Sequence, residues 1–162
     1  MTSAKAIVYP PALQAAGTAD APFEAVAQVS DVPPGTMLRV TRGDVDVLIA
    51  HTDAGVAAIA DRCPHMAAPL SIGRLEGCVL TCPLHRGSFD LRTGEVVTFP
   101  TTGGLDADGT YHATWAPPNQ AAKPPLRPND PKAQARALTR VQRIRYLPLR
   151  IRGGAVEVAW PA

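Results

Sequence analysis

Apolar and polar positions between residues 23 and 60 alternate in short runs, and a turn signal follows each run. The runs occupy residues 23–29, 37–41, 45–51 and 56–60. Between them lie the turn sequences Pro33-Pro34-Gly35, Arg42-Gly43-Asp44 and Asp53-Ala54-Gly55. A period of two with such punctuation predicts strands joined by tight turns, here an antiparallel meander.

Further runs downstream extend this pattern. Residues 79–81 and 95–99 are strand-like, and residues 145–151 and 156–160 flank Gly153-Gly154. A glycine pair between two apolar runs is a strong hairpin signal. We therefore predict an all-β domain whose last hairpin closes the sheet.

Two segments do not fit the meander. Residues 1–22 are rich in alanine and proline and lack periodicity, which predicts an N-terminal arm. Residues 101–144 predict an insertion: a proline-rich extended loop over residues 116–131, then a helix over residues 132–145 with Pro131 at its first turn. The expected organisation is an arm, 1–22, and one domain, 23–162, with an insertion at about 101–144.

Composition sets further limits. A chain of 162 residues with 46% hydrophobic content supports one buried core. No apolar run approaches the roughly 18 residues of a membrane span, and the N-terminus shows no signal peptide, so a cytoplasmic protein without membrane contact is expected. Three cysteines, two of them beside histidines, favour metal binding over a disulfide framework.

Charge is distributed unevenly along the chain. Residues 1–119 carry 7 Lys and Arg against 12 Asp and Glu, whereas residues 120–152 carry 9 against one. The basic segment is either a solvated surface or a docking element for a larger enzyme. Nucleic-acid binding is not expected, because the rest of the domain is acidic and aromatic residues do not interleave with the basic ones.

Two short motifs carry the chemistry. Cys63-Pro64-His65 and Cys82-Pro83-Leu84-His85 each place one sulfur and one imidazole on a tight loop. Two thiolates and two imidazoles form the donor set of a [2Fe-2S] cluster with mixed ligation. The same donors also satisfy a tetrahedral zinc ion.

The region around these motifs resembles the cluster-binding segment of Rieske proteins, in particular the ferredoxin-like members. The resemblance covers about residues 23–100 and 145–160, and rests on residues that include Ala68-Pro69-Leu70-Ser71, Gly73, Glu76-Gly77, Phe89-Asp90 and Thr93-Gly94-Glu95. It implies a Rieske-type antiparallel β-sandwich with a small cluster-binding subdomain. It also implies one [2Fe-2S] cluster, with Cys63 and Cys82 on one iron and His65 and His85 on the other.

Zinc explains less of the pattern. A zinc site needs neither a proline after each cysteine nor the Phe89-Asp90 and Thr93-Gly94 continuation, so the Rieske interpretation is favoured. His51 and His112 lack partners at ligand spacing and are expected to be ordinary histidines. Cys78 is expected to be a buried free thiol.

Several positions depart from the respiratory Rieske subunits. Those subunits carry two further cysteines that form a disulfide beside the cluster, and the matching positions here hold Ala68 and Leu84. They also place serine and tyrosine hydroxyls against the cluster sulfurs, where this chain has Gly87 and Phe89. Without these donors the potential is expected at the low end of the Rieske range, about −150 mV. Arg86 stands where a small residue is common, and it either acts on the cluster, contacts a partner or is simply solvated.

The resemblance implies a one-electron carrier with His65 and His85 as the electron exit. Only His51 and His112 remain for a mononuclear iron site, so the chain is not expected to be a terminal oxygenase or to convert a substrate itself. The expected partners are a flavin-dependent reductase and a terminal oxygenase or another oxidoreductase. Two alternatives stay open: a tightly bound subunit, such as the small subunit of a nitrite reductase, and a structural zinc-binding adaptor.

Overall fold

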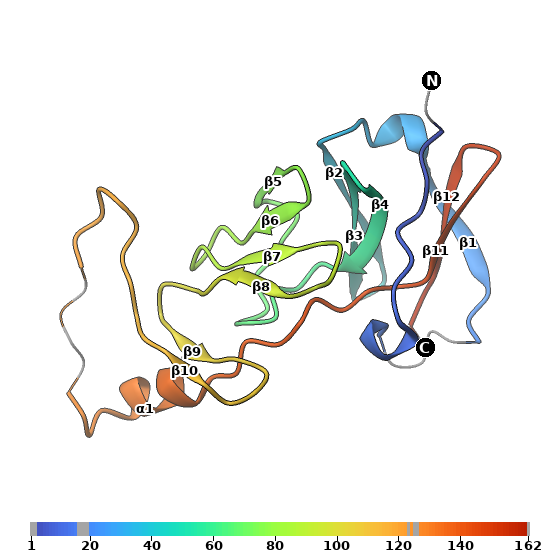
Figure 1. Ribbon diagram of the computed structural model, residues 1–162. Helices are drawn as coiled ribbons and strands as arrows, with labels where there is room; N and C mark the ends of the chain where they lie inside the picture. Colours follow the sequence, from blue (N-terminus) through green and yellow to red (C-terminus); the bar gives the residue numbers. More distant parts are fainter. Residues whose placement is uncertain (1–2, 16–19, 123, 125–126, 162) are drawn as a thin grey trace.

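The computed structural model describes residues 3–15, 20–122, 124 and 127–161. Its strands are short and antiparallel, and one α-helix accompanies them (Figure 1). This confirms the all-β prediction. The strands are β1 (Phe23–Gln28), β2 (Met37–Arg42), β3 (Val45–Thr52), β4 (Gly55–Ala60), β5 (Arg74–Glu76), β6 (Val79–Thr81), β7 (Ser88–Asp90), β8 (Val96–Thr98), β9 (Gly104–Leu105), β10 (Tyr111–His112), β11 (Leu149–Arg152) and β12 (Ala155–Ala159).

Two three-stranded sheets form a sandwich at one end of the molecule. Their strand orders are β2-β3-β4 and β1-β12-β11, and an apolar core lies between them. Val47 and Ile49 enter this core from β3, and Val156 and Val158 enter it from β12. Their spacing of two residues is the strand period that the sequence predicts.

The β2-β3-β4 sheet is buried on its other face as well. Leu48 on β3 and Ile59 on β4 point away from the sandwich core and join a second apolar cluster with Leu80, Phe89 and Tyr146. That cluster packs against a four-stranded sheet with the order β5-β6-β7-β8, which forms the small cluster-binding subdomain. The β2-β3-β4 sheet thus has an apolar core on each face, one shared with the β1-β12-β11 sheet and the other shared with the subdomain.

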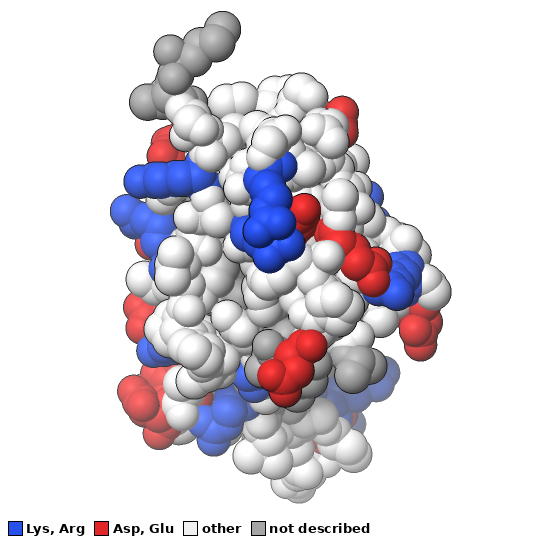
Figure 2. Space-filling model, turned by 90° about the vertical axis from the view of Figure 1, so that its right-hand side faces the viewer, with Lys and Arg blue, Asp and Glu red and all other residues white. Residues whose placement is uncertain are grey.

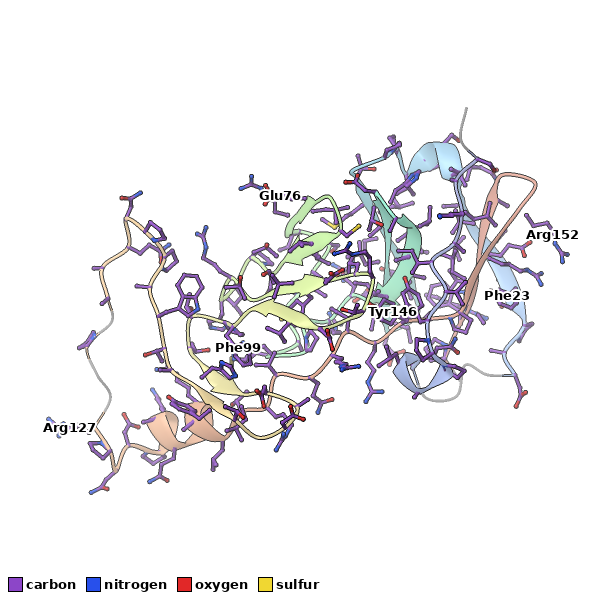
Figure 3. All side chains as sticks on the ribbon, viewed as in Figure 1. Phe23, Glu76, Phe99, Arg127, Tyr146 and Arg152 are labelled. Carbon is purple, nitrogen blue, oxygen red and sulfur yellow. The ribbon has the colours of Figure 1, made fainter. Side chains whose placement is uncertain are left out.

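The described part of the N-terminal arm is packed against the domain. The Ile7 N–H donates to the Val56 carbonyl over 2.9 Å, so the arm adds a short parallel bridge beside β4. The buried Tyr9 ring stacks on Tyr146, with ring centroids 3.4 Å apart. In Figure 3 the labelled Tyr146 lies between the sandwich and the subdomain. The stacked tyrosines therefore pack where these two parts meet.

The insertion contains the β9–β10 hairpin and helix α1 (Pro131–Leu138). Pro131 stands in the first turn as predicted, and the Asp130 carboxylate caps the helix by accepting the Lys132 N–H over 2.8 Å. The predicted C-terminus at residue 145 is wrong. After Leu138 the chain runs extended, because Val141 pairs with Leu105 and is buried in the subdomain core.

The strand boundaries differ from prediction in two places. The last hairpin begins at Leu149 and not at residue 145, because residues 145–147 cross between the sheets: the Leu147 N–H donates to Ala58, and the Arg145 carbonyl accepts from Ala60. The short strands β5, β7, β9 and β10 were not predicted, because they lack the run of apolar residues that marks β6 and β8.

The surface at the sandwich end carries both signs of charge. Figure 2 shows Lys and Arg interspersed with Asp and Glu on this face. Within the described residues, no helix is long and apolar enough to cross a membrane.

Candidate metal centre

Two loops with equivalent backbone hydrogen bonds follow β4 and β6. In the first, the Cys63 N–H donates to the Ala68 carbonyl over 2.8 Å; in the second, the Cys82 N–H donates to the Gly87 carbonyl over the same distance. Each cysteine carbonyl also accepts the N–H four residues on, from Ala67 in one loop and Arg86 in the other. The two loops therefore present their cysteines in the same local geometry.

A left-handed residue occupies the same place in both loops. Ala67 has φ 57° and Arg86 has φ 58°. Residues that carry a side chain rarely adopt this backbone conformation, whereas glycine adopts it without strain. This explains why a small residue is common at the position of Arg86.

The two sulfurs lie together in a buried place. Each sulfur accepts two backbone N–H groups: those of His65 and Met66 for Cys63, and those of Leu84 and His85 for Cys82. A hydrogen bond from the Cys63 thiol lowers the pKa of Cys82 to about 6, and the same bond together with burial raises the pKa of Cys63. This environment stabilises the thiolate of Cys82, the form that binds metal, and keeps the proton on Cys63.

The two imidazoles lie beside each other with perpendicular rings. The ring centroids of His65 and His85 are 5.0 Å apart, at an interplanar angle of 87°. Burial, together with the neighbouring His85, lowers the pKa of His65 to about 4. The His65 ring is therefore neutral at physiological pH, as metal ligation requires.

Residues outside the motifs hold the first loop and its histidine. The carboxylate of the fully buried Asp61 accepts the Ser71 backbone N–H over 2.7 Å and the Ser71 hydroxyl over 2.6 Å. Thr102, buried and located in the insertion, places its hydroxyl 3.1 Å from Nε2 of His65. Sequence reasoning missed both Asp61 and Thr102, although Ser71 belongs to the segment that carries the resemblance.

The other histidines and the third cysteine have ordinary roles. Nδ1 of His51 bonds the Val32 carbonyl over 2.7 Å. His112 stacks on Phe99 and bonds Asp106. Cys78 is a free thiol as expected, but it is half-buried and not buried.

The donor set fits a dinuclear cluster. The two sulfurs form one pair and the two imidazoles form another, which is the arrangement needed when thiolates bind one iron and histidines the other. Across the described part of the chain, no three His, Cys, Asp or Glu side chains converge on a single point. All three cysteines are free, in keeping with Ala68 and Leu84 at the positions of the respiratory disulfide.

A family comparison agrees with this geometry. The model of the Rieske [2Fe-2S] domain matches residues 23–113, more than half of the chain. The chain belongs to the Rieske [2Fe-2S] family. Its cofactor is accordingly one [2Fe-2S] cluster, as the motif and the resemblance predict.

Among proteins, this Rieske chain is similar to ferredoxin components. It is 38% identical over 83 residues to the ferredoxin component of a naphthalene 1,2-dioxygenase system from Pseudomonas putida, which covers 51% of this chain and 79% of the relative. It is 40% identical over 78 residues to a 3-phenylpropionate/cinnamic acid dioxygenase ferredoxin subunit from Escherichia coli, covering 48% and 73%.

Solved structures share the fold of this Rieske domain. The ferredoxin of carbazole 1,9a-dioxygenase from Nocardioides aromaticivorans superposes with a TM-score of 0.54 at 21% identity, covering 86% of this chain and 98% of that one. Dicamba monooxygenase gives a TM-score of 0.56 at 24% identity, covering 88% of this chain and 34% of the larger protein. The predicted Rieske-type fold is confirmed.

Proposed function

We propose that this chain carries single electrons from a flavin-dependent reductase to a terminal oxygenase, with its cluster held by Cys63, Cys82, His65 and His85. The main support is the pairing of two sulfurs and two imidazoles on equivalent loops. When bound, the cluster supplies reversible one-electron reduction. The chain's own residues favour the thiolate of Cys82 and the neutral imidazole of His65, and they keep both sulfurs away from water.

The surface beside the histidines suits a protein partner. Met66 follows His65 and is 58% exposed, and Leu84 precedes His85 and is 57% exposed. Exposed apolar side chains next to an electron exit favour transient docking, because burying them contributes to association. We infer that the oxygenase and the reductase contact this loop tip in turn.

Similarity to named proteins bears on the alternatives. The relatives described above are ferredoxin components of dioxygenase systems, which favours a carrier over a nitrite reductase subunit. A zinc-binding adaptor is disfavoured, because residues 23–113 match the Rieske [2Fe-2S] domain, whose two cysteines and two histidines bind a cluster. We place the carrier in the cytoplasm, where thiols stay reduced.

Electron paramagnetic resonance tests the cofactor and its ligands. The dithionite-reduced protein should give the low average g value of mixed histidine and cysteine ligation, and Cys82→Ser should abolish this signal. Cys78→Ser is the matched control and should keep it. A signal retained in Cys82→Ser, or a protein that contains zinc and gives no signal, would refute the ligand assignment.

Reconstitution tests the role. The reductase and oxygenase components of naphthalene dioxygenase are mixed with this chain in place of their own ferredoxin. The mixture should consume NADH and convert naphthalene to product. Reduction of this chain without onward transfer to the oxygenase would favour the bound-subunit alternative.

A further inference from the structure

A cavity of about 470 Å³ lies between the second cluster loop and the insertion. Its walls include His85 and Arg86 from the loop, Tyr111 and Trp115 from the segment after β9, and Arg136 from α1. This volume is typical of a site for a small organic molecule. The family motif supplies only one wall, since the other walls belong to the insertion.

The cavity wall is cationic. Arg86 and Arg136 both line it, and no Asp or Glu is among the described lining residues. Neither guanidinium forms an ion pair with a carboxylate in the part of the chain that the structure describes. Seven other arginines each lie within ion-pair distance of an acidic side chain, such as Arg143 beside Glu95 at 2.8 Å. Two unmatched planar donors in one cavity favour a carboxylate ligand.

The cavity also offers a fixed aromatic wall. The Trp115 Nε1–H donates to the Phe99 carbonyl over 2.7 Å, which sets the orientation of the indole. Tyr111 and the apolar side chains of Pro83 and Leu84 line the same space. An aromatic ring therefore finds stacking and apolar contacts beside the two cations.

We propose that this cavity binds a small aromatic carboxylate, with the ring against Trp115 and Tyr111 and the carboxylate toward Arg86 and Arg136. The site borders the cluster ligands, because His85 is one of its walls, but its aromatic wall and Arg136 come from the insertion. This inference goes beyond electron transfer, because the binding depends on residues of the insertion and does not depend on whether the cluster is oxidised or reduced.

Isothermal titration calorimetry on the holoprotein tests this binding with benzoate as the probe. Benzoate should bind saturably with one site per chain. Benzamide, which keeps the ring without the charge, and acetate, which keeps the charge without the ring, should each bind at least tenfold more weakly. No saturable benzoate binding, or equal binding of all three, would overturn the proposal.

Variants locate the site. Arg136→Gln should weaken benzoate at least tenfold, and Ala133→Phe, which adds a ring to the α1 wall, should block it. Arg152→Gln removes a charge at the opposite end of the molecule, as the labelled side chain in Figure 3 shows, and should change affinity less than twofold. An unchanged cluster spectrum in each variant confirms folding. Equal effects of Arg136→Gln and Arg152→Gln, or benzoate binding that survives both Arg136→Gln and Ala133→Phe, would refute the site.

Discussion

The hydroxyl of Thr102 lies 3.1 Å from Nε2 of His65, and the two residues are 37 positions apart in the chain. Because this hydroxyl lies against Nε2, Nδ1 is the ring nitrogen that would bind iron in the proposed centre. A partner on the second ring nitrogen fixes the orientation of the imidazole and raises its basicity. The insertion thus acts on one histidine of the centre and leaves the other at the edge of the cavity.

Replacing Thr102 by valine should raise the reduction potential. With iron on Nδ1, Nε2 would carry the proton and donate it to the Thr102 hydroxyl, which favours the oxidised iron, so loss of the hydroxyl would destabilise the oxidised state. One hydrogen bond of about 0.5 to 1.5 kcal/mol corresponds to about 20 to 60 mV for one electron. Protein-film voltammetry measures the change, with Thr101→Val as the control. A lower or unchanged potential in Thr102→Val would show that this bond does not tune the centre.

The potential of the native protein should lie at the low end of the Rieske range, about −150 mV. Gly87 and Phe89 supply no hydroxyl beside the buried sulfurs. Gly87→Ser should shift the potential upward, because it supplies a hydroxyl near the sulfurs. A Cβ at Gly87 would lie 3.0 Å from the Pro100 ring, so this ring must move by a few tenths of an ångström. A native potential above +100 mV would contradict the assignment of a low-potential carrier.

The potential should be constant near neutral pH and fall at alkaline pH. Oxidised iron acidifies the imidazoles that bind it, so above their pKa the oxidised state loses a proton that the reduced state keeps. The slope there should approach about 59 mV per pH unit for each proton released. Voltammetry from pH 6 to 11 follows the decline. A flat profile to pH 11 would argue against histidine ligation.

The Tyr9–Tyr146 stack should contribute strongly to stability. Tyr9→Ala should lower the free energy of unfolding by about 3 kcal/mol, because it leaves a cavity against the buried Tyr146 ring. Tyr146→Phe should cost about 1 kcal/mol, because it removes the hydroxyl that donates to the Leu91 carbonyl over 3.2 Å. Urea unfolding measures both, and Val8→Ala, at a 90% exposed position, is the control. Equal effects of Val8→Ala and Tyr9→Ala would mean that the arm is not part of the core.

Ser71→Ala should weaken the first cluster loop. Asp61 is buried, and Ser71 supplies two of its hydrogen bonds through its backbone and side chain. Losing the hydroxyl should cost about 1 to 3 kcal/mol, because a buried carboxylate is left partly unsatisfied. Loss of cluster absorbance during incubation at 40 °C should be faster than in the native protein. Ser88→Ala, at a buried serine of β7 for which the structure gives no side-chain hydrogen bond, serves as the comparison.

The sequence predicted those parts of the fold that depend on local pattern. The strands that became β1 to β4 follow a period of two, and the glycine pair at residues 153–154 forms the last turn. The predicted end of α1 was wrong because Val141 and Ile144 are spaced as on a helix. Both side chains are in fact buried, and they belong to an extended segment whose N–H groups donate to the carbonyls of Leu105 and Gly94. Tertiary contacts here outweigh helical propensity.

The candidate site was predictable in its ligands but not in its surroundings. Cysteine and histidine spacing identifies four donors directly. The equivalence of the two loops is hidden, because His65 comes two residues after its cysteine and His85 comes three after. Thr102 and the cavity were also out of reach, since both depend on how the insertion folds back onto the cluster loops.

The matched backbone hydrogen bonds of the two loops bear on how the holoprotein is made. Each loop closes on itself through its own N–H groups and carbonyls, from Cys63 to Ala68 and from Cys82 to Gly87. The backbone of each loop is therefore braced by bonds that do not pass through the cluster. We expect loss of the cluster to leave these bonds in place, so that slow amide hydrogen exchange at Cys63 and Cys82 persists in the apoprotein.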